Sequence, residues 1–318
     1  MMELDKQTAA ILAQGVEAGA PALYELPVAD ARIALREMSF ALDAVETPVA
    51  KHEERAIPGP NGEIPVRIYW PEAAAGALPI LLLYHGGGWT LGDMDTHENV
   101  CRYYCANAGV IVINVDYRLA PEHKFPAGVD DCYAALEWAA EHAAEIGGDA
   151  SRIAVTGDSA GGNLSAVMCQ LAKARGGPRI AFQALTYPST DLSEEANEKY
   201  ASRKKLGGGE YFLGQKDIVW LIGLYLKDAA LVRDARVSPI LTEDLSGLPP
   251  ALVITAGFDP LHDEGKAYAD RLAAAGVPVE YKCFETTIHG FMSFSGAIDA
   301  GKEGLALVAS RVKAALSV

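Results

Sequence analysis

The chain has 318 residues, of which 50% are hydrophobic and 22% are charged, a composition typical of a folded globular protein with a sizeable core. Acidic residues outnumber basic residues by 42 to 27, which gives a formal net charge of −15. This balance argues against binding to nucleic acids and to anionic membranes, because both need clustered Lys and Arg side chains.

The N-terminal sequence and the cysteines bear on the compartment. The opening sequence MMELDKQTAA lacks the basic and apolar segments of a secretory signal, and the aliphatic run from Leu78 to Tyr84 is too short to span a bilayer. The five cysteines are an odd number, which suits a reducing compartment better than a disulfide framework. Cys101 and Cys105 are four apart, but no Cys or His pair with zinc-type spacing accompanies them. We therefore expect a cytoplasmic protein without a metal site.

The predicted elements alternate between strands and helices from about Ile80 onward. Residues 1–45 are alanine-rich and predict helices, and Ile64–Tyr69 follows a Pro-Gly-Pro-Asn-Gly turn, which predicts an antiparallel hairpin at a sheet edge. The predicted strands that follow are Ile80–Tyr84, Val110–Val115, Arg152–Thr156, Ile180–Leu185, Ala251–Thr255 and Val279–Phe284; the predicted helices are Thr96–Asn107, Ala127–Glu145, Gly161–Ala174, Glu264–Ala275 and Ala300–Leu316. The pattern predicts an α/β fold with a mostly parallel sheet of about eight strands and helices on both faces.

One long segment interrupts this alternation. Residues 190–238 are acidic, glycine-rich and aromatic, and an insertion of this length at the carboxyl end of a strand usually forms a lid or a pocket wall. We interpret residues 1–45 and 190–238 together as a cap. The catalytic core then consists of residues 46–189 and 239–318.

A Gly-x-Ser-x-Gly motif surrounds Ser159 in the segment Gly157-Asp158-Ser159-Ala160-Gly161-Gly162. The motif by itself is weak, but it lies between a predicted strand and a predicted helix, where small neighbours permit the sharp turn that exposes a nucleophilic serine. Ser159 is therefore the predicted nucleophile.

A rarer motif, His85-Gly86-Gly87-Gly88-Trp89, directly follows the predicted strand Ile80–Tyr84. Glycines let the backbone turn tightly and direct its N–H groups at a developing oxyanion. We predict Gly87, Gly88 and Ala160 as the oxyanion-hole donors. For His85 we favour a structural role, in which its side chain holds this loop by hydrogen bonds.

The predicted base and acid follow the last two strands. His289 is alone among the seven histidines in lying just after the final strand, and Asp259 lies just after the strand before it. Asp259 would accept the Nδ1–H of His289 and fix its tautomer. Asp263 and Glu285 are alternative candidates for the acid. We interpret each of them instead as a charge at a helix N-terminus or a solvated loop residue. The chain order Ser159, Asp259, His289 is that of α/β-hydrolases.

Together, these motifs and the segment Asp116-Tyr117-Arg118-Leu119-Ala120-Pro121-Glu122-His123-Lys124-Phe125-Pro126-Ala127 resemble the bacterial hormone-sensitive-lipase family of esterases, from about residue 50 to the C-terminus. The resemblance implies an α/β-hydrolase fold with a helical cap, no metal and no organic cofactor. It implies small-molecule esters of short to medium acyl chains as substrates. It also implies that a homodimer can form along the last strand and the C-terminal helix.

Four further residues are predicted to contact the substrate: Trp89, Asp158, Tyr187 and Ile288. Trp89 adjoins the oxyanion glycines, which favours a place in the acyl pocket, although it could instead pack the cap onto the core. Arg118 and Glu122 are expected to brace the loop under the site through charge-assisted hydrogen bonds.

The predicted function is carboxylesterase activity through a serine acyl-enzyme. Two alternatives stay open. One is an amidase or peptidase with the same three residues, although relatives of prolyl oligopeptidase carry a propeller domain for which this chain has no room. The other is a non-catalytic ligand-binding protein of the same fold, against which the presence of His289 argues.

Overall fold

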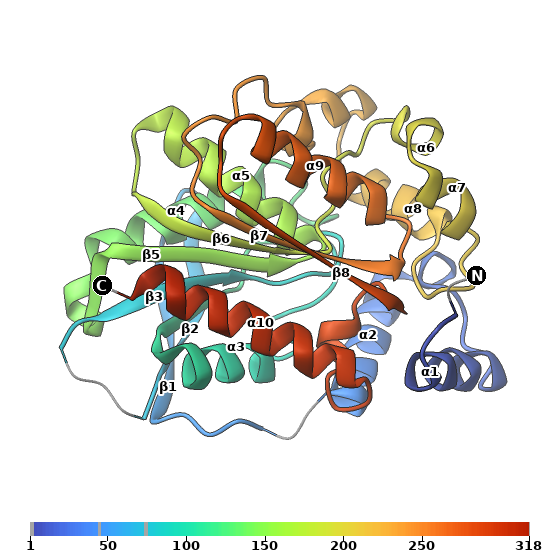
Figure 1. Ribbon diagram of the computed structural model, residues 1–318, viewed down its shortest axis with the longest axis horizontal. Helices are drawn as coiled ribbons and strands as arrows, with labels where there is room; N and C mark the ends of the chain where they lie inside the picture. Colours follow the sequence, from blue (N-terminus) through green and yellow to red (C-terminus); the bar gives the residue numbers. More distant parts are fainter. Residues whose placement is uncertain (1–2, 44–45, 73–75, 318) are drawn as a thin grey trace.

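The computed structural model describes residues 3–43, 46–72 and 76–317, and these residues contain an eight-stranded sheet in the order β1-β2-β4-β3-β5-β6-β7-β8 (Figure 1). The strands are β1 (Lys51–Gly59), β2 (Gly62–Trp70), β3 (Leu78–Tyr84), β4 (Ile111–Val115), β5 (Gly148–Asp158), β6 (Ile180–Thr186), β7 (Ala251–Phe258) and β8 (Val279–Ile288). β1 pairs with β2 and β2 with β4 in antiparallel fashion, and every later pair is parallel. The predicted mostly parallel sheet is confirmed.

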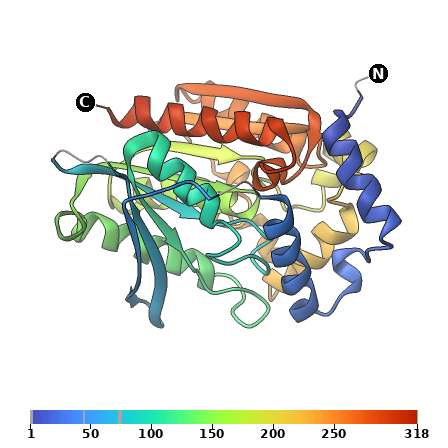
Figure 2. The same ribbon diagram turned by 90° about the horizontal axis from the view of Figure 1, so that it is seen from below.

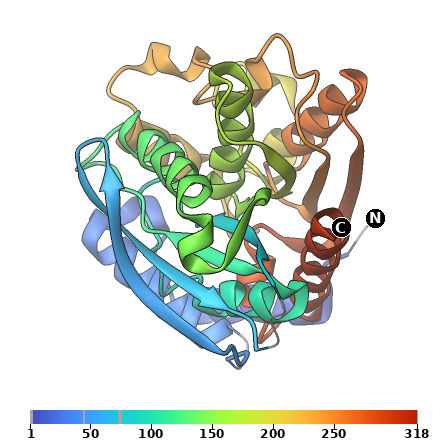
Figure 3. The ribbon, with the colours of Figure 1, turned by 90° about the vertical axis from the view of Figure 1, so that its left-hand side faces the viewer.

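The antiparallel hairpin β1–β2 forms one edge of the sheet (Figure 3). Gly59 pairs with Gly62, so a two-residue turn joins the strands, as glycine- and asparagine-rich sequence favours. Ile57 pairs with Ile64, and both side chains are buried. The hairpin predicted from this turn is thus present, with β1 as its outer strand.

The central strands are buried on both faces of the sheet. Ile80, Leu82 and Tyr84 of β3 pack on one face, whereas Leu81 and Leu83 pack on the other, because successive side chains of a strand point in opposite directions. The first face is covered by α4 (Ala127–Glu141), α5 (Ala160–Arg175) and α9 (His262–Ala274), and the second by α3 (Glu98–Tyr104) and α10 (Asp299–Leu316) (Figure 1). Burial on both faces explains why β3 is an uninterrupted hydrophobic run.

Helix boundaries differ from expectation mainly around α3. The predicted helix Thr96–Asn107 is an α-helix only from Glu98 to Tyr104, and a π-helical turn, Cys105–Gly109, follows it. Cys101 and Cys105 are free and buried there. No helix in the described part of the chain combines the length and the apolar character needed to cross a bilayer.

The N-terminal helices and the insertion lie at the same end of the sheet (Figures 1 and 2). The helices are α1 (Lys6–Glu17) and α2 (Val28–Leu42) on one side, and α6 (Ala196–Lys199), α7 (Ala201–Leu206) and α8 (Gln215–Tyr225) on the other. Ala31 of α2, Leu91 and Leu221 of α8 share one apolar cluster. Residues 1–2 and 44–45 of the predicted cap segment lie outside the described residues.

Arg32 of α2 connects the N-terminal helices to the core. Its guanidinium donates to the carbonyl oxygens of Thr90 and Ala120, both at 2.9 Å, and to both carboxylate oxygens of Glu122 at 2.9 and 2.7 Å. Glu122 therefore braces the N-terminal helix. Arg118 instead pairs with Asp131 through two bonds of 2.8 and 2.7 Å, so the two residues form separate charge-assisted contacts.

Candidate active site

Ser159 lies at the turn between β5 and α5 with φ 55° and ψ −115°, a region that residues with a side chain rarely adopt. Two groups of backbone hydrogen bonds hold this conformation. The Ser159 N–H donates to Thr186 O at 2.9 Å, and the Ser159 carbonyl accepts from Asn163 N at 3.0 Å and Ser189 N at 3.2 Å. The turn is therefore fixed by β6 and its following loop as well as by its own helix.

The glycines of the serine motif are required by close backbone packing. A Cβ atom added to Gly161 would lie 1.8 Å from Tyr84 O, and one added to Gly157 would lie 2.4 Å from the same oxygen. Tyr84 ends β3, so the serine turn packs directly against the start of the His85 loop. The two sequence motifs are thus adjacent in space because neither glycine carries a side chain.

The structure brings Ser159, His289 and Asp259 together. His289 Nε2 lies 2.9 Å from Ser159 Oγ, and His289 Nδ1 lies 2.7 Å from Asp259 Oδ2. Since a carboxylate accepts hydrogen bonds, Nδ1 carries a hydrogen and Nε2 is left to accept from the serine hydroxyl. Asp259 is fully buried, and its other oxygen accepts from Leu261 N at 2.8 Å.

The competing carboxylates lie elsewhere. Asp263 is in the first turn of α9 and accepts from Ser202 N at 2.8 Å. Glu285 is exposed on β8. Asp259 is the carboxylate hydrogen-bonded to His289.

The loop after β3 carries the three glycines into the same cavity as Ser159 and His289. Gly87 has φ +111°, and a Cβ there would lie 2.1 Å from Leu91 O, so only glycine fits. The Gly87 carbonyl accepts from Leu91 N at 2.8 Å, which closes the loop behind it. Ala160 is the first residue of α5, where a backbone N–H has no partner within its own helix.

His85 is buried in the manner expected of a structural residue. Its Nδ1 lies 2.8 Å from Gly86 O, and its ring stacks on Tyr117 with a centroid distance of 4.4 Å. Burial lowers the pKa of His85 to about 4, so this ring is neutral at physiological pH. None of the hydrogen bonds described for the His85 side chain involves Ser159.

The cavity at Ser159 has a volume of about 90 Å³. Its walls come from both the N-terminal segment and the insertion, and they are largely apolar. They include Leu23 and Leu35 from the N-terminal segment and Phe212, Leu213 and Leu221 from the insertion. An apolar chamber with a few polar groups at one end is typical of small-molecule sites.

Only one of the four predicted substrate contacts lines this cavity. Asp158 does, whereas Trp89, Tyr187 and Ile288 do not. The Trp89 ring stacks on Tyr225 of α8 at a centroid distance of 4.5 Å and an interplanar angle of 7°. Trp89 therefore packs the insertion onto the rest of the chain. This is the second of the two roles considered for it, in place of a position in the acyl pocket.

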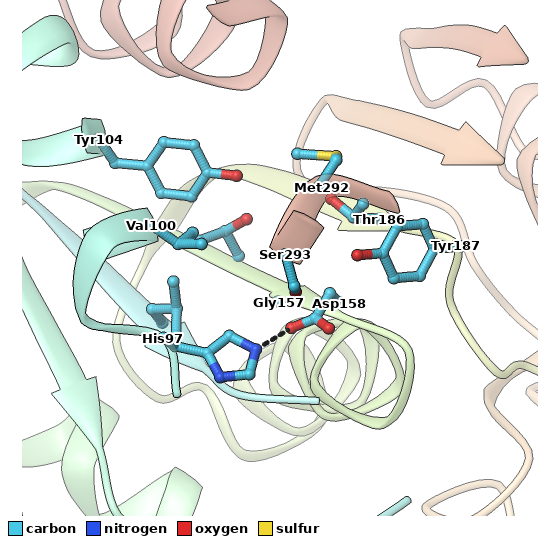
Figure 4. A pocket seen from close by; sticks show the side chains of 11 residues that line it. His97, Val100, Tyr104, Gly157, Asp158, Thr186, Tyr187, Met292 and Ser293 are labelled. Carbon is cyan, nitrogen blue, oxygen red and sulfur yellow. Dashed lines mark hydrogen bonds and ion pairs between the residues drawn. The ribbon is translucent and has the colours of Figure 1, made fainter. Parts of the chain in front are cut away.

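Tyr187 and Ile288 are almost fully buried, at 1% and 0% exposure. Ile288 precedes His289 on β8, where neighbouring residues point to opposite sides. Tyr187 follows β6, and its ring centroid lies 4.8 Å from that of His289. Tyr187 instead lines a separate cavity of about 10 Å³ behind Asp158 (Figure 4).

His97 is a site residue that the sequence reasoning missed. It lines the Ser159 cavity, and its Nε2 lies 2.9 Å from Asp158 Oδ1. Burial alone would lower the pKa of His97, but Asp158 outweighs burial and holds this pKa above its ordinary value. Burial would likewise raise the pKa of Asp158, and His97 holds it below its ordinary value. The only signal in the sequence was the position of His97 shortly after the glycine loop.

Comparison with known proteins agrees with this geometry. A family model described as alpha/beta hydrolase fold matches residues 81–293. Carboxylesterase NlhH of Mycobacterium tuberculosis is 45% identical over 296 residues, which cover 90% of this chain and 89% of that protein. Carboxylic ester hydrolase LipN of the same species is 52% identical over 244 residues, which cover 75% of this chain and 63% of LipN.

Solved structures show the same relationship over almost the whole chain. A hyperthermophilic esterase from the archaeon Pyrobaculum calidifontis superposes with a TM-score of 0.94 at 39% identity, covering 98% of this chain and 99% of that one. With the sheet order, the motifs and these relatives in agreement, the chain belongs to the alpha/beta hydrolase family, among the esterases related to hormone-sensitive lipase.

Proposed function

We propose that Ser159, His289 and Asp259 are the catalytic triad of this protein, which is a serine carboxylic ester hydrolase. The observation that carries the assignment is the unbroken hydrogen-bonded line from Ser159 Oγ through both ring nitrogens of His289 to Asp259, at 2.9 and 2.7 Å. These distances place the nucleophile within reach of its base and the base within reach of its orienting acid.

The mechanism follows from this line. Ser159 Oγ attacks the ester carbonyl while His289 Nε2 takes the hydroxyl proton, and Asp259 stabilises the resulting imidazolium. The N–H groups of Gly87, Gly88 and Ala160 donate hydrogen bonds to the former carbonyl oxygen and stabilise its negative charge. His289 then protonates the departing alkoxide, which leaves as the alcohol. Water, deprotonated by His289, attacks the acyl-enzyme and releases the acid with Ser159 restored.

The cavity supports esters with short to medium acyl chains as substrates. Its volume of about 90 Å³ and its leucine and phenylalanine walls favour a compact apolar acyl group. Asp158 is the predicted substrate contact that lines it. The mechanism needs no metal or organic cofactor.

The proposal extends to the compartment and the oligomeric state of the protein. The protein acts in the cytoplasm, in keeping with its free cysteines. It forms a homodimer along β8 and α10, because β8 is the last strand in the sheet order and can pair with a second copy.

The test is hydrolysis of a series of p-nitrophenyl esters, from acetyl to palmitoyl, by the wild type and the Ser159→Ala variant. We expect activity to peak at short acyl chains and to fall by about four powers of ten or more in the variant. Ser165→Ala is the matched control, since its hydroxyl donates to Gly161 O in the same helix. Unchanged hydrolysis by pure Ser159→Ala protein would contradict the proposal.

A further inference from the structure

A hydrogen-bonded connection joins the loop at residues 93–97 to the first glycine of the oxyanion loop. Asp158 Oδ1 accepts from Gly86 N at 2.9 Å and also lies 2.9 Å from His97 Nε2. Gly86 fits against this carboxylate because it has no side chain: an added Cβ would lie 2.3 Å from Asp158 Oδ2. His97 therefore contacts, through Asp158, the backbone immediately before Gly87 and Gly88.

The hydrogen bonds around His97 define its charge. The Thr96 hydroxyl donates to Asp93 O at 2.8 Å, so its oxygen accepts from His97 Nδ1, which lies 2.9 Å away. His97 Nε2 faces the Asp158 carboxylate, which also accepts. The Gly86 N–H lies 3.4 Å from Nε2 but only 2.9 Å from the carboxylate, which is its stronger acceptor. Both ring nitrogens thus face acceptors, and only the imidazolium carries a hydrogen on each.

A small cavity behind Asp158 adjoins the pair (Figure 4), and the side chains of His97 and Asp158 are 8% and 18% exposed. The hydroxyl groups of Tyr104 and Tyr187 point into this cavity, and its volume of about 10 Å³ leaves room for roughly one water molecule. The titratable groups that face the pair from the surrounding elements include Asp43, His85, Asp93, Tyr104, Tyr117, Tyr187 and His289.

We propose that His97 is a positioning residue for ester hydrolysis: it holds Asp158 against the Gly86 N–H and supplies the positive charge that offsets Asp158 beside the developing oxyanion. This inference rests on the proposed role of Gly87 and Gly88 as oxyanion donors. A carboxylate that adjoins Ser159 and lines the same cavity opposes negative charge on the substrate oxygen unless a cation compensates it. His97 is that cation.

The charge predicts a pH dependence with a definite sign. Because Asp158 holds the pKa of His97 above its ordinary value, the imidazolium persists to higher pH than that of a free histidine and is lost as the pH rises through the raised pKa. The Asp158 charge is then uncompensated, so kcat of the wild type should decline to a lower plateau at high pH. KM should change little, because the oxyanion forms after binding.

The experiment compares His97→Gln, which keeps a hydrogen-bond donor but no charge, with His97→Leu, which keeps neither. With p-nitrophenyl butyrate, His97→Gln should have a kcat about tenfold below that of the wild type at pH 7, and no alkaline decline. His97→Leu should lose up to about a hundredfold in kcat, less than the loss of a direct oxyanion donor. His142→Gln, a histidine at the end of α4, is the matched control.

A double variant separates charge from packing. Asp158→Asn retains an oxygen that can accept from Gly86 N but removes the negative charge, so Asp158→Asn combined with His97→Gln should recover part of the kcat lost in His97→Gln alone. A merely structural histidine predicts no such recovery. Affinity for an alkyl trifluoromethyl ketone, which forms a tetrahedral oxyanion on the serine, should fall in parallel with kcat.

The outcomes distinguish this inference from the proposed function. Rates are normalised to the fraction of enzyme that reacts with a fluorophosphonate, and thermal unfolding reports stability. If the wild type does not react and does not hydrolyse esters, the proposed function is wrong. If it does, but normalised kcat and its pH profile in His97→Gln match the wild type, the inference is overturned. Should His97→Leu fail to fold, His97→Gln still decides the question.

Discussion

At the scale of single residues, the serine turn depends on glycines that exclude any side chain. Ser159 keeps a positive φ because Gly157 and Gly161 let the turn lie against the end of β3. Strain of this kind persists only where the surroundings determine it. The closeness of Gly161 to Tyr84 O therefore gives a sharp test.

Gly161→Ala should destabilise the protein by about 3 kcal/mol or more, since a Cβ placed 1.8 Å from Tyr84 O forces the backbone to shift. The same shift should displace Ser159 and lower kcat. Gly223→Ala is the matched control: it lies in α8 with no atom within 4 Å of the added Cβ, and should stabilise slightly. Urea unfolding and ester hydrolysis measure both effects; equal stability of the two variants would contradict the prediction.

At the scale of elements, two of the ion pairs that join the N-terminal helices and the insertion to the rest of the chain differ in burial. Arg32 of α2 binds Glu122, and Arg203 of α7 binds Glu264 of α9. The first pair is partly exposed, whereas the second is almost fully buried, with side-chain exposures of 2% and 0%. Breaking the buried pair should cost more unfolding free energy than breaking the partly exposed pair, because it leaves an unpaired charge away from water.

Glu122→Gln should lower the unfolding temperature at pH 7 but not at acid pH. The Arg32 hydrogen bond lowers the pKa of Glu122 from 4.5 to about 2. A lowered pKa contributes stability that is fully present above pH 4.5 and is lost as the pH falls toward 2. The difference from the wild type should thus shrink below pH 4.5. Glu137→Gln, at an exposed position of α4, should show no such trend; a constant difference for Glu122→Gln would count against the contact.

Arg203→Ala should cost about 3 to 5 kcal/mol of unfolding free energy, because it leaves the Glu264 carboxylate buried without its cation. Burial already raises the pKa of Glu264 despite Arg203. Arg203→Met with Glu264→Gln should recover much of the loss, as uncharged side chains remove the desolvation cost. Chemical denaturation measures both; a loss below about 1 kcal/mol in Arg203→Ala would show that the pair contributes little.

At the scale of the whole molecule, one edge of the sheet differs from the other. β1 carries four charged residues among nine, Lys51, Glu53, Glu54 and Arg55, whereas β8 carries three among ten, Glu280, Lys282 and Glu285. β8 contacts α10 through the Glu280–Arg311 ion pair. Charged edge strands resist pairing with a second sheet. The proposed dimer therefore uses β8.

Light scattering after size exclusion should give twice the 33.7 kDa chain mass. The backbone amides of β8 should exchange with deuterium more slowly as protein concentration rises, since pairing protects them, and those of β1 should not change. A mass of one chain at every concentration would refute the dimer.

The sequence predicted the sheet and the three side chains that the structure brings together, Ser159, Asp259 and His289, because both depend on local pattern. A strand buried on two faces, such as β3, is continuously apolar, and Asp259 and His289 directly follow strands whose ends meet at one edge. The predictions that the cavity does not support concern Trp89, Tyr187 and Ile288, whose surroundings are set by distant segments such as α8. His97 was missed for the same reason, since its partner Asp158 is 61 residues away.

The shared cluster of Ala31, Leu91 and Leu221 has a consequence for synthesis on the ribosome. Helix α2 is translated well before α8, yet Ala31 of α2 belongs to the same apolar cluster as Leu221 of α8. Domains usually fold from the N-terminus as they emerge, but here an early helix must wait, with its apolar side chains exposed, until α8 has been made. Helix α2 is therefore a segment that we expect to need a chaperone during translation.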